Sequence, residues 1–331
     1  METKEYKKNY LIDKFNINSI PEIEVIETEL LSILSDSRGG VRDICSQLLG
    51  AGGKRLRPLF VLYSGMIFSP LAQELVNAAV AAELIHMASL VHDDIIDNSS
   101  LRRSKPSVNH SWGNHIAVLC GDYLFAKAFG ILSKNRLIGS MDYMVYAIEN
   151  MCQGEILQAC SKYDFNINVD TYFDCISKKT AIFLECCCKS GAFVAGASED
   201  CINTIGEYGL NMGLAFQIVD DILDFCGDEK MTGKPKFEDL RQGNITLPVL
   251  TLLNNEQYRS DIKELIIGKS YSNEVLEEVA EVMIETGIIR ASFDIASNYI
   301  KRAKACLMML PQSQYITHLY NYADVLMRRV N

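Results

Sequence analysis

The sequence of 331 residues predicts an all-α fold in a single domain, and three observations lead to this class. None of the seven prolines lies between residues 107 and 234, and because an interior proline breaks a helix, this stretch leaves room for several long helices. Apolar residues recur at helical spacing over long windows, whereas the alternating pattern of strands is absent. No composition shift marks a linker, so we expect one domain over residues 1–331, with residues 1–20 loosely ordered.

The expected elements follow in chain order. Two glycine pairs, at 39–40 and 52–53, mark turns, and Pro58 suits the first turn of the helix that follows. Helical periodicity then predicts five longer helices, at 72–98, 115–134, 140–161, 171–197 and 201–226. We expect loops at 98–113, 163–169 and 227–245.

Composition excludes several classes of protein. The net charge of −10 and a pI of about 5.1 argue against a nucleic-acid partner. We read no transmembrane run and no signal peptide in the sequence. Eleven cysteines without a CxxC motif, three of them consecutive at 186–188, indicate reduced and mostly buried thiols in a cytoplasmic protein.

Two Asp-rich motifs are the most informative feature. Asp-Asp-Ile-Ile-Asp at 93–97 recurs as Asp-Asp-Ile-Leu-Asp at 220–224, each inside an apolar run. On a helix the first and fifth residues share a face, with Cβ atoms about 5–6 Å apart. Six carboxylates in apolar surroundings repel one another unless cations lie among them, and open coordination positions suit Mg²⁺. We therefore expect the two motifs to face each other and to hold a diphosphate through bridging metal ions.

Basic residues form three further candidate sites. The segment GGKRLRP at 52–58 is not a P-loop, since Arg55 follows Lys54 where Ser or Thr is required. It is either a pocket for a second phosphate group or a solvated turn before a helix. Arg102 and Arg103 follow the first Asp motif and either bind phosphate or lie on a surface loop. Lys179-Thr180 and Lys234 lie in or near helix ends, where a lone lysine is usually a solvated charge.

The histidines suggest two rival metal enzymes. His92-Asp93 is similar to the dyad of HD-type phosphohydrolases, but the second Asp motif has no histidine. Glu83-x-x-His86 is similar to half of a ferritin-like di-iron site, which requires a second Glu-x-x-His. No other histidine has a glutamate three residues before it, so both rivals are disfavoured.

The chain resembles the all-trans polyprenyl diphosphate synthase family over roughly residues 25–330, in segments that occur in this order: GGKRLRP, ELIHMASLVHDDIID, LRR, KTA, FQIVDDILD, GKP and DLRQGNITLP. The segments IHMASLVHDD and GNITLPVL are most similar to the catalytic subunit of bacterial heptaprenyl or hexaprenyl diphosphate synthases. The resemblance implies long antiparallel helices around a deep central cavity, the isoprenoid synthase fold.

The resemblance also implies residue roles. The catalytic residues would be Asp93, Asp97, Asp220 and Lys179. About three Mg²⁺ ions would be bound by Asp93, Asp97 and Asp220, and Asp224 would be a further carboxylate near the metal ions. Asp94 and Asp221 would be neighbouring carboxylates. Isopentenyl diphosphate would be held by Lys54, Arg57, His86 and Arg103. The allylic diphosphate would be held by Arg102, Lys179, Thr180, Gln217 and Lys234.

The sequence departs from the family pattern at three positions. Ser104 replaces the usual glycine, Gln242 stands where glutamate is common, and Asn244 replaces a lysine. Loss of that lysine removes one phosphate cation, so we expect weaker substrate binding at most.

The implied reaction needs no side-chain nucleophile. Metal and cations stabilise the departing diphosphate, the allylic C–O bond ionises, and the double bond of isopentenyl diphosphate attacks. A proton is then lost to the released diphosphate, and apolar walls exclude water. The alternatives are a short-chain synthase, a non-catalytic partner subunit, and a terpene cyclase. Intact aspartates argue against the partner subunit, and the GKRxRP segment argues against the cyclase.

Product length and assembly are two further expectations. The small residues Ala88 and Ser89, five and four positions before Asp93, would leave a product tunnel open. We expect chains of about C30–C35, for quinone side chains, limited deeper by residues such as Ile148 and Met151. Close helix packing is the other explanation of these small residues. We expect a homodimer, or a heterodimer with a small non-catalytic subunit, and the helix at 115–134 is either its interface or simple core.

Overall fold

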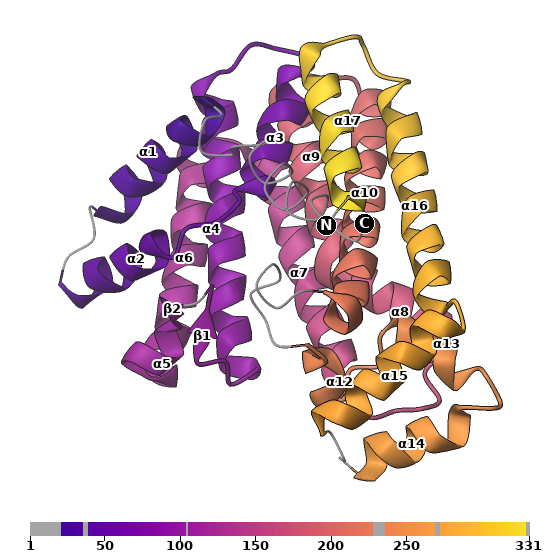
Figure 1. Cartoon of the computed structure of the whole chain (residues 1–331). Coiled ribbons are helices and arrows are strands. Elements are labelled where there is room, and N and C mark those ends of the chain that lie inside the picture. Colours follow the sequence, from indigo (N-terminus) through magenta and orange to yellow (C-terminus); the bar gives the residue numbers. More distant parts are fainter. Residues whose placement is uncertain (1–20, 36–38, 104, 228–235, 269–271, 329–331) are drawn as a thin grey trace, which may run out of the picture. The chain divides into compact units, whose positions relative to one another are not determined.

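The computed structural model describes residues 21–328, apart from 36–38, 104, 228–235 and 269–271. These residues are helical almost throughout (Figure 1). The only strands among them are two antiparallel strands of two residues each, which form one hairpin. The predicted all-α class is therefore confirmed.

The chain divides into two compact units. Unit 1 comprises Met1–Met144, Cys187–Ile202 and Gln312–Ile316. Unit 2 comprises Val145–Cys186, Asn203–Pro311 and Thr317–Asn331. The prediction of a single domain, and of a central cavity, stays a prediction.

The elements that begin in unit 1 before residue 144 are α1 (Pro21–Ser35), α2 (Gly40–Gly50), α3 (Leu56–Met66), α4 (Gln73–Ile96), β1 (Leu101–Arg102), β2 (Lys105–Pro106), α5 (Val108–Trp112), α6 (Asn114–Lys134) and α7 (Ile138–Cys160). The elements that follow are α8 (Val169–Ile176), η3 (Ser177–Ala181), α9 (Ile182–Val194), α10 (Glu199–Cys226), α12 (Glu238–Arg241), α13 (Leu247–Leu253), α14 (Arg259–Gly268), α15 (Asn273–Glu285), α16 (Ile288–Leu307) and α17 (Gln314–Met327).

The five long helices expected from periodicity are present, with two differences in detail. The run expected at 171–197 is divided by η3, a short π-helical segment between α8 and α9. The expected loop at 98–113 contains the β1–β2 hairpin and α5. Apolar periodicity reveals neither a single wider helical turn nor strands of two residues, which is why the pattern did not predict them.

Unit 1 is organised around α4. This helix packs against α3 and α6, and its buried residues run from Leu75 to Asp94 on all sides of the helix. A helix that is apolar all round is typical of a buried core. Its C-terminal end is tied to α6 by His92, whose Nε2 donates to the carbonyl of Val118 at 3.1 Å. The core of unit 1 therefore holds the first Asp motif on a well-packed helix.

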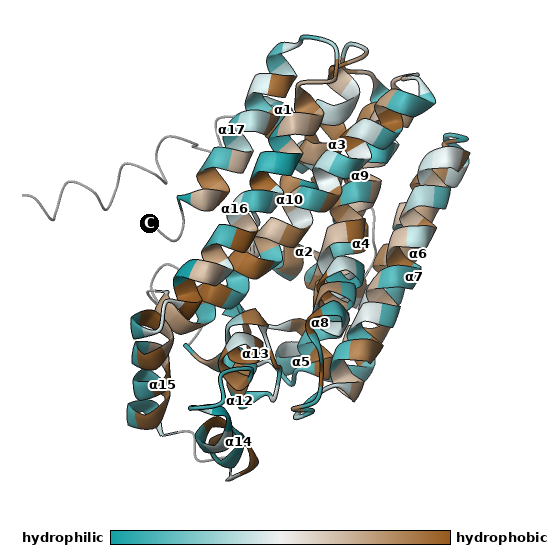
Figure 2. Ribbon diagram, turned by 90° about the vertical axis from the view of Figure 1, so that its right-hand side faces the viewer, coloured by the Kyte–Doolittle hydropathy of each residue, from teal (hydrophilic) through white to brown (hydrophobic). Residues whose placement is uncertain are grey.

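Two helices, α4 and α6, are long and apolar enough to cross a membrane by length and composition alone, which the sequence reading did not expect. In α4, 72% of the apolar window is buried inside the protein, as in a core helix. In α6 only 33% is buried, and Val118 and Leu119 are 43% and 52% exposed. The ribbon in Figure 2 is coloured by hydropathy and shows hydrophobic residues along the long helices. The face of α6 around these two residues is thus an exposed apolar surface of unit 1.

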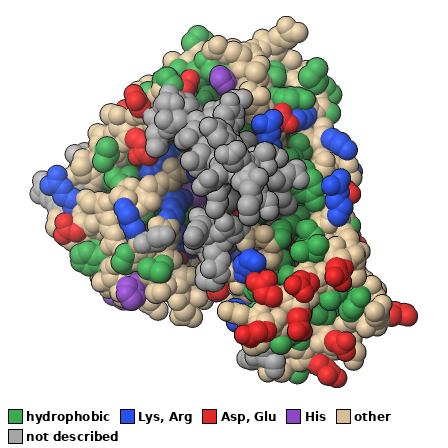
Figure 3. Space-filling view, viewed as in Figure 1, with side chains coloured by type: hydrophobic (Ala, Val, Ile, Leu, Met, Phe, Trp, Pro, Cys, Tyr) green, Lys and Arg blue, Asp and Glu red, His purple; other side chains and the backbone are tan. Residues whose placement is uncertain are grey.

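Unit 2 buries α10 and α13 within its core. Ile205, Tyr208, Ile218 and Ile222 of α10 are fully buried, and the Tyr208 hydroxyl donates to the carbonyl of Leu319 in α17. The α12–α15 part of the unit carries a concentration of acidic side chains on its surface (Figure 3). Acidic residues are frequent in α15, whose apolar residues face inward at helical spacing. This acidic surface agrees with the low pI.

The cysteines are as the sequence predicts. All eleven are free thiols, and six of them are buried, including the run Cys186-Cys187-Cys188. Burial raises the pKa of Cys120 to about 12, so this thiol stays protonated and unreactive at neutral pH.

Candidate active site

The first Asp motif ends α4. The backbone N–H of Asp97 donates to the carbonyl of Asp93 at 2.8 Å, so helical geometry continues through the motif and both side chains share a face. Both are half-buried. Asp94 is only 4% exposed, and its Oδ1 accepts a hydrogen bond from Nε of Arg102 at 2.8 Å. Burial raises the pKa of Asp94, and the charge of Arg102 opposes that rise.

The second Asp motif lies in the last turns of α10 in unit 2. Asp221 is 3% exposed and accepts two hydrogen bonds, from the Tyr172 hydroxyl at 2.6 Å and from Nε2 of Gln217 at 2.9 Å. Burial raises the pKa of Asp221 well above its usual range, and these two donors oppose the rise. Asp220 and Asp224 are half-buried, and Oδ1 of Asp224 accepts the backbone N–H of Glu238 at 3.1 Å.

The two motifs divide their carboxylates in the same way. In each, the middle aspartate is buried and bonded within its own unit, while the first and fifth are half-exposed. Among the described residues no three His, Cys, Asp or Glu side chains gather into a ready-made metal site. Mg²⁺ is usually held by one or two carboxylates together with waters and substrate phosphates, so a half-exposed pair on each motif fits this ion. The facing of the two motifs stays a prediction.

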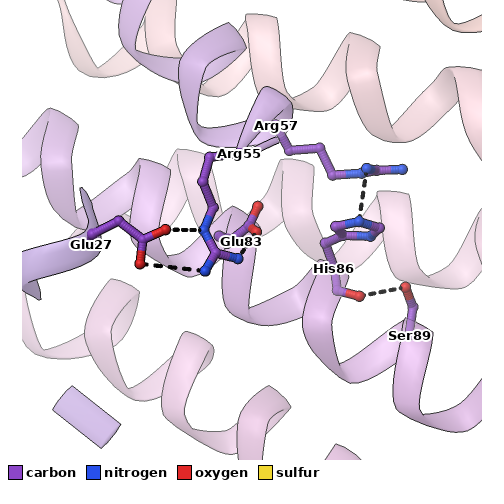
Figure 4. A network of polar contacts seen from close by, with 6 residues as sticks. All are labelled: Glu27, Arg55, Arg57, Glu83, His86 and Ser89. Atoms are coloured by element: carbon purple, nitrogen blue, oxygen red, sulfur yellow. Dashed lines mark hydrogen bonds and ion pairs between the residues drawn. The ribbon is translucent and has the colours of Figure 1, made fainter. Parts of the chain in front are cut away.

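Arg57 of α3 and His86 of α4 meet, as expected for two residues of one substrate site (Figure 4). Nη1 of Arg57 lies 3.0 Å from Nε2 of His86. Because a guanidinium N–H only donates, Nε2 accepts, and the imidazole is neutral with its proton on Nδ1. Burial and the charges of Arg57 and Arg103 together hold the pKa of His86 well below its usual range. Burial also lowers the pKa of Arg57.

A pocket in unit 1 opens beside this pair. Its wall combines apolar side chains from α4 with cationic, polar and acidic ones, among them Arg55, Glu83, His86, Asp94, Arg102 and Arg103. Both carboxylates in this wall are paired with an arginine. Arg103 is exposed and has left-handed backbone, with φ of 53°, which turns the chain sharply after β1. Lys54 is exposed. A wall of this composition suits a ligand with a phosphate group at one end and a hydrocarbon at the other.

A second set of predicted residues gathers in unit 2 around η3. The Nζ of Lys179 lies 2.6 Å from Oε2 of Glu155 and 2.5 Å from Oε1 of Gln158, both on α7. The Thr180 hydroxyl donates to Oε1 of Gln217 at 2.8 Å. The helices approach so closely that a Cβ on residue 154, a glycine, would lie 2.6 Å from the backbone nitrogen of Lys179. π-Helical segments of this kind are frequent at functional sites.

Thr180 and Gln217 belong to one hydrogen-bonded chain that reaches the second Asp motif. Gln217 accepts from Thr180 and donates to Asp221, so three residues from η3 and α10 are held together. The structure thus brings Thr180 and Gln217 together in unit 2, whereas the Nζ of Lys179 is bound to Glu155 and Gln158. The assignment of these residues to the allylic substrate stays a prediction. Arg102, assigned to the same substrate, lies in unit 1 and is paired with Asp94.

The positions expected to set product length are small and partly buried. Ala88 is fully buried, and Ser89 is half-buried with its hydroxyl donating to the carbonyl of His86 at 2.9 Å. Ile148 and Met151 of α7 are half-buried. Lys234 and Ser104 lie outside the described residues. Asn244 is buried, and its Nδ2 donates to Asp239 at 3.3 Å, so this amide serves the packing of unit 2.

The contacts of the histidines do not support the two rival metal sites, the HD-type dyad and the ferritin-like di-iron site. Glu83 and His86 do not form a shared metal site, because each is bound to a different arginine. His92 is used in packing α4 against α6.

The sequence reading gave no supporting role to four residues: Arg55, Glu83, Glu155 and Tyr172. All four act through partners on other elements, and no spacing along the chain reveals such pairs. Arg55 had a visible signal, since it stands inside the basic segment at 52–58.

The chain thus combines an all-α fold with two aspartate-rich motifs, each at the end of a long helix. The family model for polyprenyl synthetase matches residues 40–283, and the chain belongs to that family. It is thus a prenyltransferase with the isoprenoid synthase fold.

Three known proteins give the range of similarity. Heptaprenyl diphosphate synthase component 2 of Bacillus subtilis (strain 168) is 37% identical over 93% of this chain and 88% of its own length. Geranylgeranyl diphosphate synthase of Saccharolobus solfataricus is 35% identical over 80% of this chain and 82% of its own. The crystal structure of polyprenyl synthase from Caulobacter crescentus, complexed with calcium and isoprenyl diphosphate, has a TM-score of 0.88 at 30% identity. That similarity covers 94% of this chain and 95% of the other.

Proposed function

We propose that the protein condenses isopentenyl diphosphate repeatedly with an allylic diphosphate such as farnesyl diphosphate, and releases an all-trans polyprenyl diphosphate of about C30–C35. One observation carries the proposal. A single helix, α4, carries the Asp93–Asp97 pair at its end and His86, bound to Arg57, two turns earlier. A diphosphate held by cations beside a diphosphate held through metal is the requirement for joining two diphosphate substrates. A terpene cyclase acts on a single diphosphate substrate, so it does not need the cationic site for a second diphosphate.

The roles of the side chains follow from their charge and surroundings. Lys54, Arg57, His86 and Arg103 bind the diphosphate of isopentenyl diphosphate, with neutral His86 donating from Nδ1. Lys179, Thr180, Gln217, Arg102 and Lys234 bind the allylic diphosphate.

The outer aspartates of both motifs hold about three Mg²⁺ ions, which neutralise the departing diphosphate when bound. Apolar side chains such as Leu90 and Val91 exclude water from the carbocation. The released diphosphate takes the proton.

The relatives support a medium chain length and leave a short-chain activity as the alternative. The Bacillus relative is named as a heptaprenyl synthase, and the Saccharolobus relative as a geranylgeranyl synthase. The small side chains of Ala88, which is fully buried, and Ser89, which is half-buried, support the longer product, because neither is bulky enough to block a growing chain beside α4.

The proposal includes a partner and a compartment. The Bacillus relative is named as one component, which supports assembly with a second copy or a small non-catalytic subunit. The exposed apolar face of α6 around Val118 and Leu119 is the proposed interface. The proposed compartment is the cytoplasm. Light scattering tests the interface: Leu119→Glu should lower the mass of the assembly. An unchanged mass, or a fully active wild-type monomer at micromolar concentration, would contradict it.

Simultaneous binding tests the two-substrate proposal. Isopentenyl diphosphate is titrated by calorimetry into protein already saturated with Mg²⁺ and a non-reactive thio analogue of farnesyl diphosphate. We expect the second ligand to bind with a stoichiometry near one. Displacement of the analogue instead would indicate a single diphosphate site and refute the proposal.

A further inference from the structure

Arg55 stands between two residues assigned to substrate but has different partners. Its Nε lies 2.6 Å from Oε1 of Glu27 on α1, and its Nη1 lies 2.7 Å from Oε1 of Glu83 on α4 (Figure 4). Nη2 is 3.4 Å from the second oxygen of Glu27. Arg55 is 3% exposed. The guanidinium is therefore committed to two carboxylates, from two helices, inside unit 1.

The backbone at Arg55 is in a rarely adopted conformation. Arg55 is the N-cap of α3 and has φ of 46° and ψ of 36°, in the left-handed region. Residues other than glycine keep such a conformation only where their surroundings enforce it. The ion pairs with Glu27 and Glu83 supply that enforcement, because they fix the side chain from both sides. The direction of the chain from Lys54 into Arg57 thus depends on Arg55.

Glu83 connects this turn to the substrate pocket. It is 2% exposed and lies one turn before His86 on α4. Its charge raises the pKa of Arg55 and opposes the fall in the pKa of Arg57 and Arg103. One buried carboxylate therefore stands among three guanidinium groups and balances their repulsion.

The second glycine of the turn, Gly53, lies against two guanidinium groups. A Cβ on Gly53 would lie 2.6 Å from Nη1 of Arg103 and 3.1 Å from Nη1 of Arg55. Two guanidinium groups thus pack against the backbone of residue 53. Arg55 and Arg103 approach the same point, but only Arg55 is held there by glutamates on two helices.

We propose that Arg55 is a positioning residue: with Glu27 and Glu83 it fixes the turn that presents Lys54 and Arg57 to the diphosphate of isopentenyl diphosphate. Its side chain lines the pocket, but its guanidinium binds the two glutamates and not the substrate. The inference rests on the proposed function of this pocket. A diphosphate at Arg55 would meet two carboxylates, whereas Arg57 offers its guanidinium beside a neutral imidazole.

Glu83→Gln distinguishes a positioning role from a purely electrostatic one, because the two roles predict changes of opposite sign in the KM for isopentenyl diphosphate. If the cations act only through their charge, removal of a nearby carboxylate strengthens diphosphate binding and lowers the KM for isopentenyl diphosphate. If Arg55 acts by positioning, loss of its ion pair loosens the turn. We then expect this KM to rise about 10-fold or more, with the KM for the allylic substrate unchanged.

The variants Arg55→Met and Glu27→Gln complete the test. Arg55→Met should raise the same KM, and the double variant Arg55→Met, Glu83→Gln should be no worse than the more affected single variant, since both break one interaction. Arg55→Lys should recover only part of the loss, because lysine lacks the fork. Glu27 is partly exposed, so Glu27→Gln should disturb the fold least of these variants. It replaces Glu83→Gln in the test if the latter does not fold. Glu74→Gln, exposed on the same helix α4, is the control.

Calorimetric binding of isopentenyl diphosphate without primer gives a second readout that does not require turnover. A KM for isopentenyl diphosphate that falls or stays constant in Glu83→Gln would overturn the inference. So would an equal rise in the KM of both substrates. A wild-type protein that condenses no isopentenyl diphosphate would instead refute the proposed function.

Discussion

The hydroxyl of Tyr172 donates to Oδ2 of Asp221 at 2.6 Å, and both groups are almost completely buried. The other oxygen of Asp221 accepts from Gln217. The middle carboxylate of the second motif is thus held on both sides by protein donors, and Asp220 and Asp224 are the two carboxylates that we propose bind metal. The first motif shows the same division, with Arg102 bound to Asp94.

Tyr172→Phe should destabilise the protein by about 1–3 kcal/mol, because a buried carboxylate oxygen loses its donor. The free energy of unfolding in guanidinium chloride measures this. Tyr146→Phe, at an exposed tyrosine of α7, is the matched control and should have no effect. A stability unchanged in Tyr172→Phe would show that the hydrogen bond contributes nothing.

Asp93→Ala and Asp220→Ala should each lower turnover by on the order of 100-fold or more while helicity is retained. Each removes a half-exposed carboxylate from the pair that fits Mg²⁺. Activity should vanish in EDTA and return with Mg²⁺. Asp142→Ala, at an exposed aspartate of α7, is the control. Full activity in EDTA would exclude the metal-dependent mechanism.

Arg57→Ala and His86→Ala should mainly raise the KM for isopentenyl diphosphate, by about 10- to 100-fold. Lys179→Ala and Arg102→Ala should act mainly on the allylic substrate. Steady-state kinetics with each substrate varied in turn distinguishes the two sets. If all four changes shifted the constant of one substrate, the assignment of two separate pockets would be wrong.

His86 should make the stability depend on pH below about 6.5. The folded-state pKa of His86 is depressed, so between that value and about 6.5 the unfolded chain binds a proton that the folded chain does not. Stability therefore falls as the pH is lowered through this window, by at most about 1.4 kcal/mol per pH unit for one proton.

Unfolding at about pH 5.5 and 7.5 checks the role of His86. The difference between the two pH values should shrink in His86→Gln and persist in His110→Gln, which changes an exposed histidine of α5. An identical pH dependence in wild type and His86→Gln would contradict the neutral, buried imidazole.

Ala88→Phe together with Ser89→Phe should shorten the product to about C15–C20, because two large side chains would block the tunnel that we propose runs beside α4. Catalysis should survive, since the Asp motifs are untouched. Mass spectrometry of the products measures this. If the double variant made the chain length of the parent, the growing chain does not pass these residues.

Much of the fold could be predicted from the sequence because apolar periodicity is a property of each helix by itself. The spans of α4, α6, α7 and α10 were predicted to within a few residues. The π-helical segment at Lys179 could not be predicted, since it depends on the close approach of Gly154 on another helix. The hairpin after Asp97 depends on left-handed residues such as Arg103, whose side chain does not favour that conformation.

The site could be predicted residue by residue only where a motif carries the chemistry. Asp93, Arg57 and His86 stand in recognisable segments, and the structure pairs the last two. Arg55, Glu83 and Tyr172 escaped because their roles depend on partners distant in sequence. The middle aspartates differ from the outer ones only through such partners, so their burial could not be read from the sequence.

The most direct test of the central claim is the mass of the product. The protein is incubated with isopentenyl diphosphate, farnesyl diphosphate and Mg²⁺, alone and with a candidate small subunit, and the products are measured by mass spectrometry. We expect a series of all-trans chains that ends at about C30–C35. A product that stops at about C15–C20 would contradict the medium-chain assignment, and a cyclised hydrocarbon with no consumption of isopentenyl diphosphate would contradict the prenyltransferase itself.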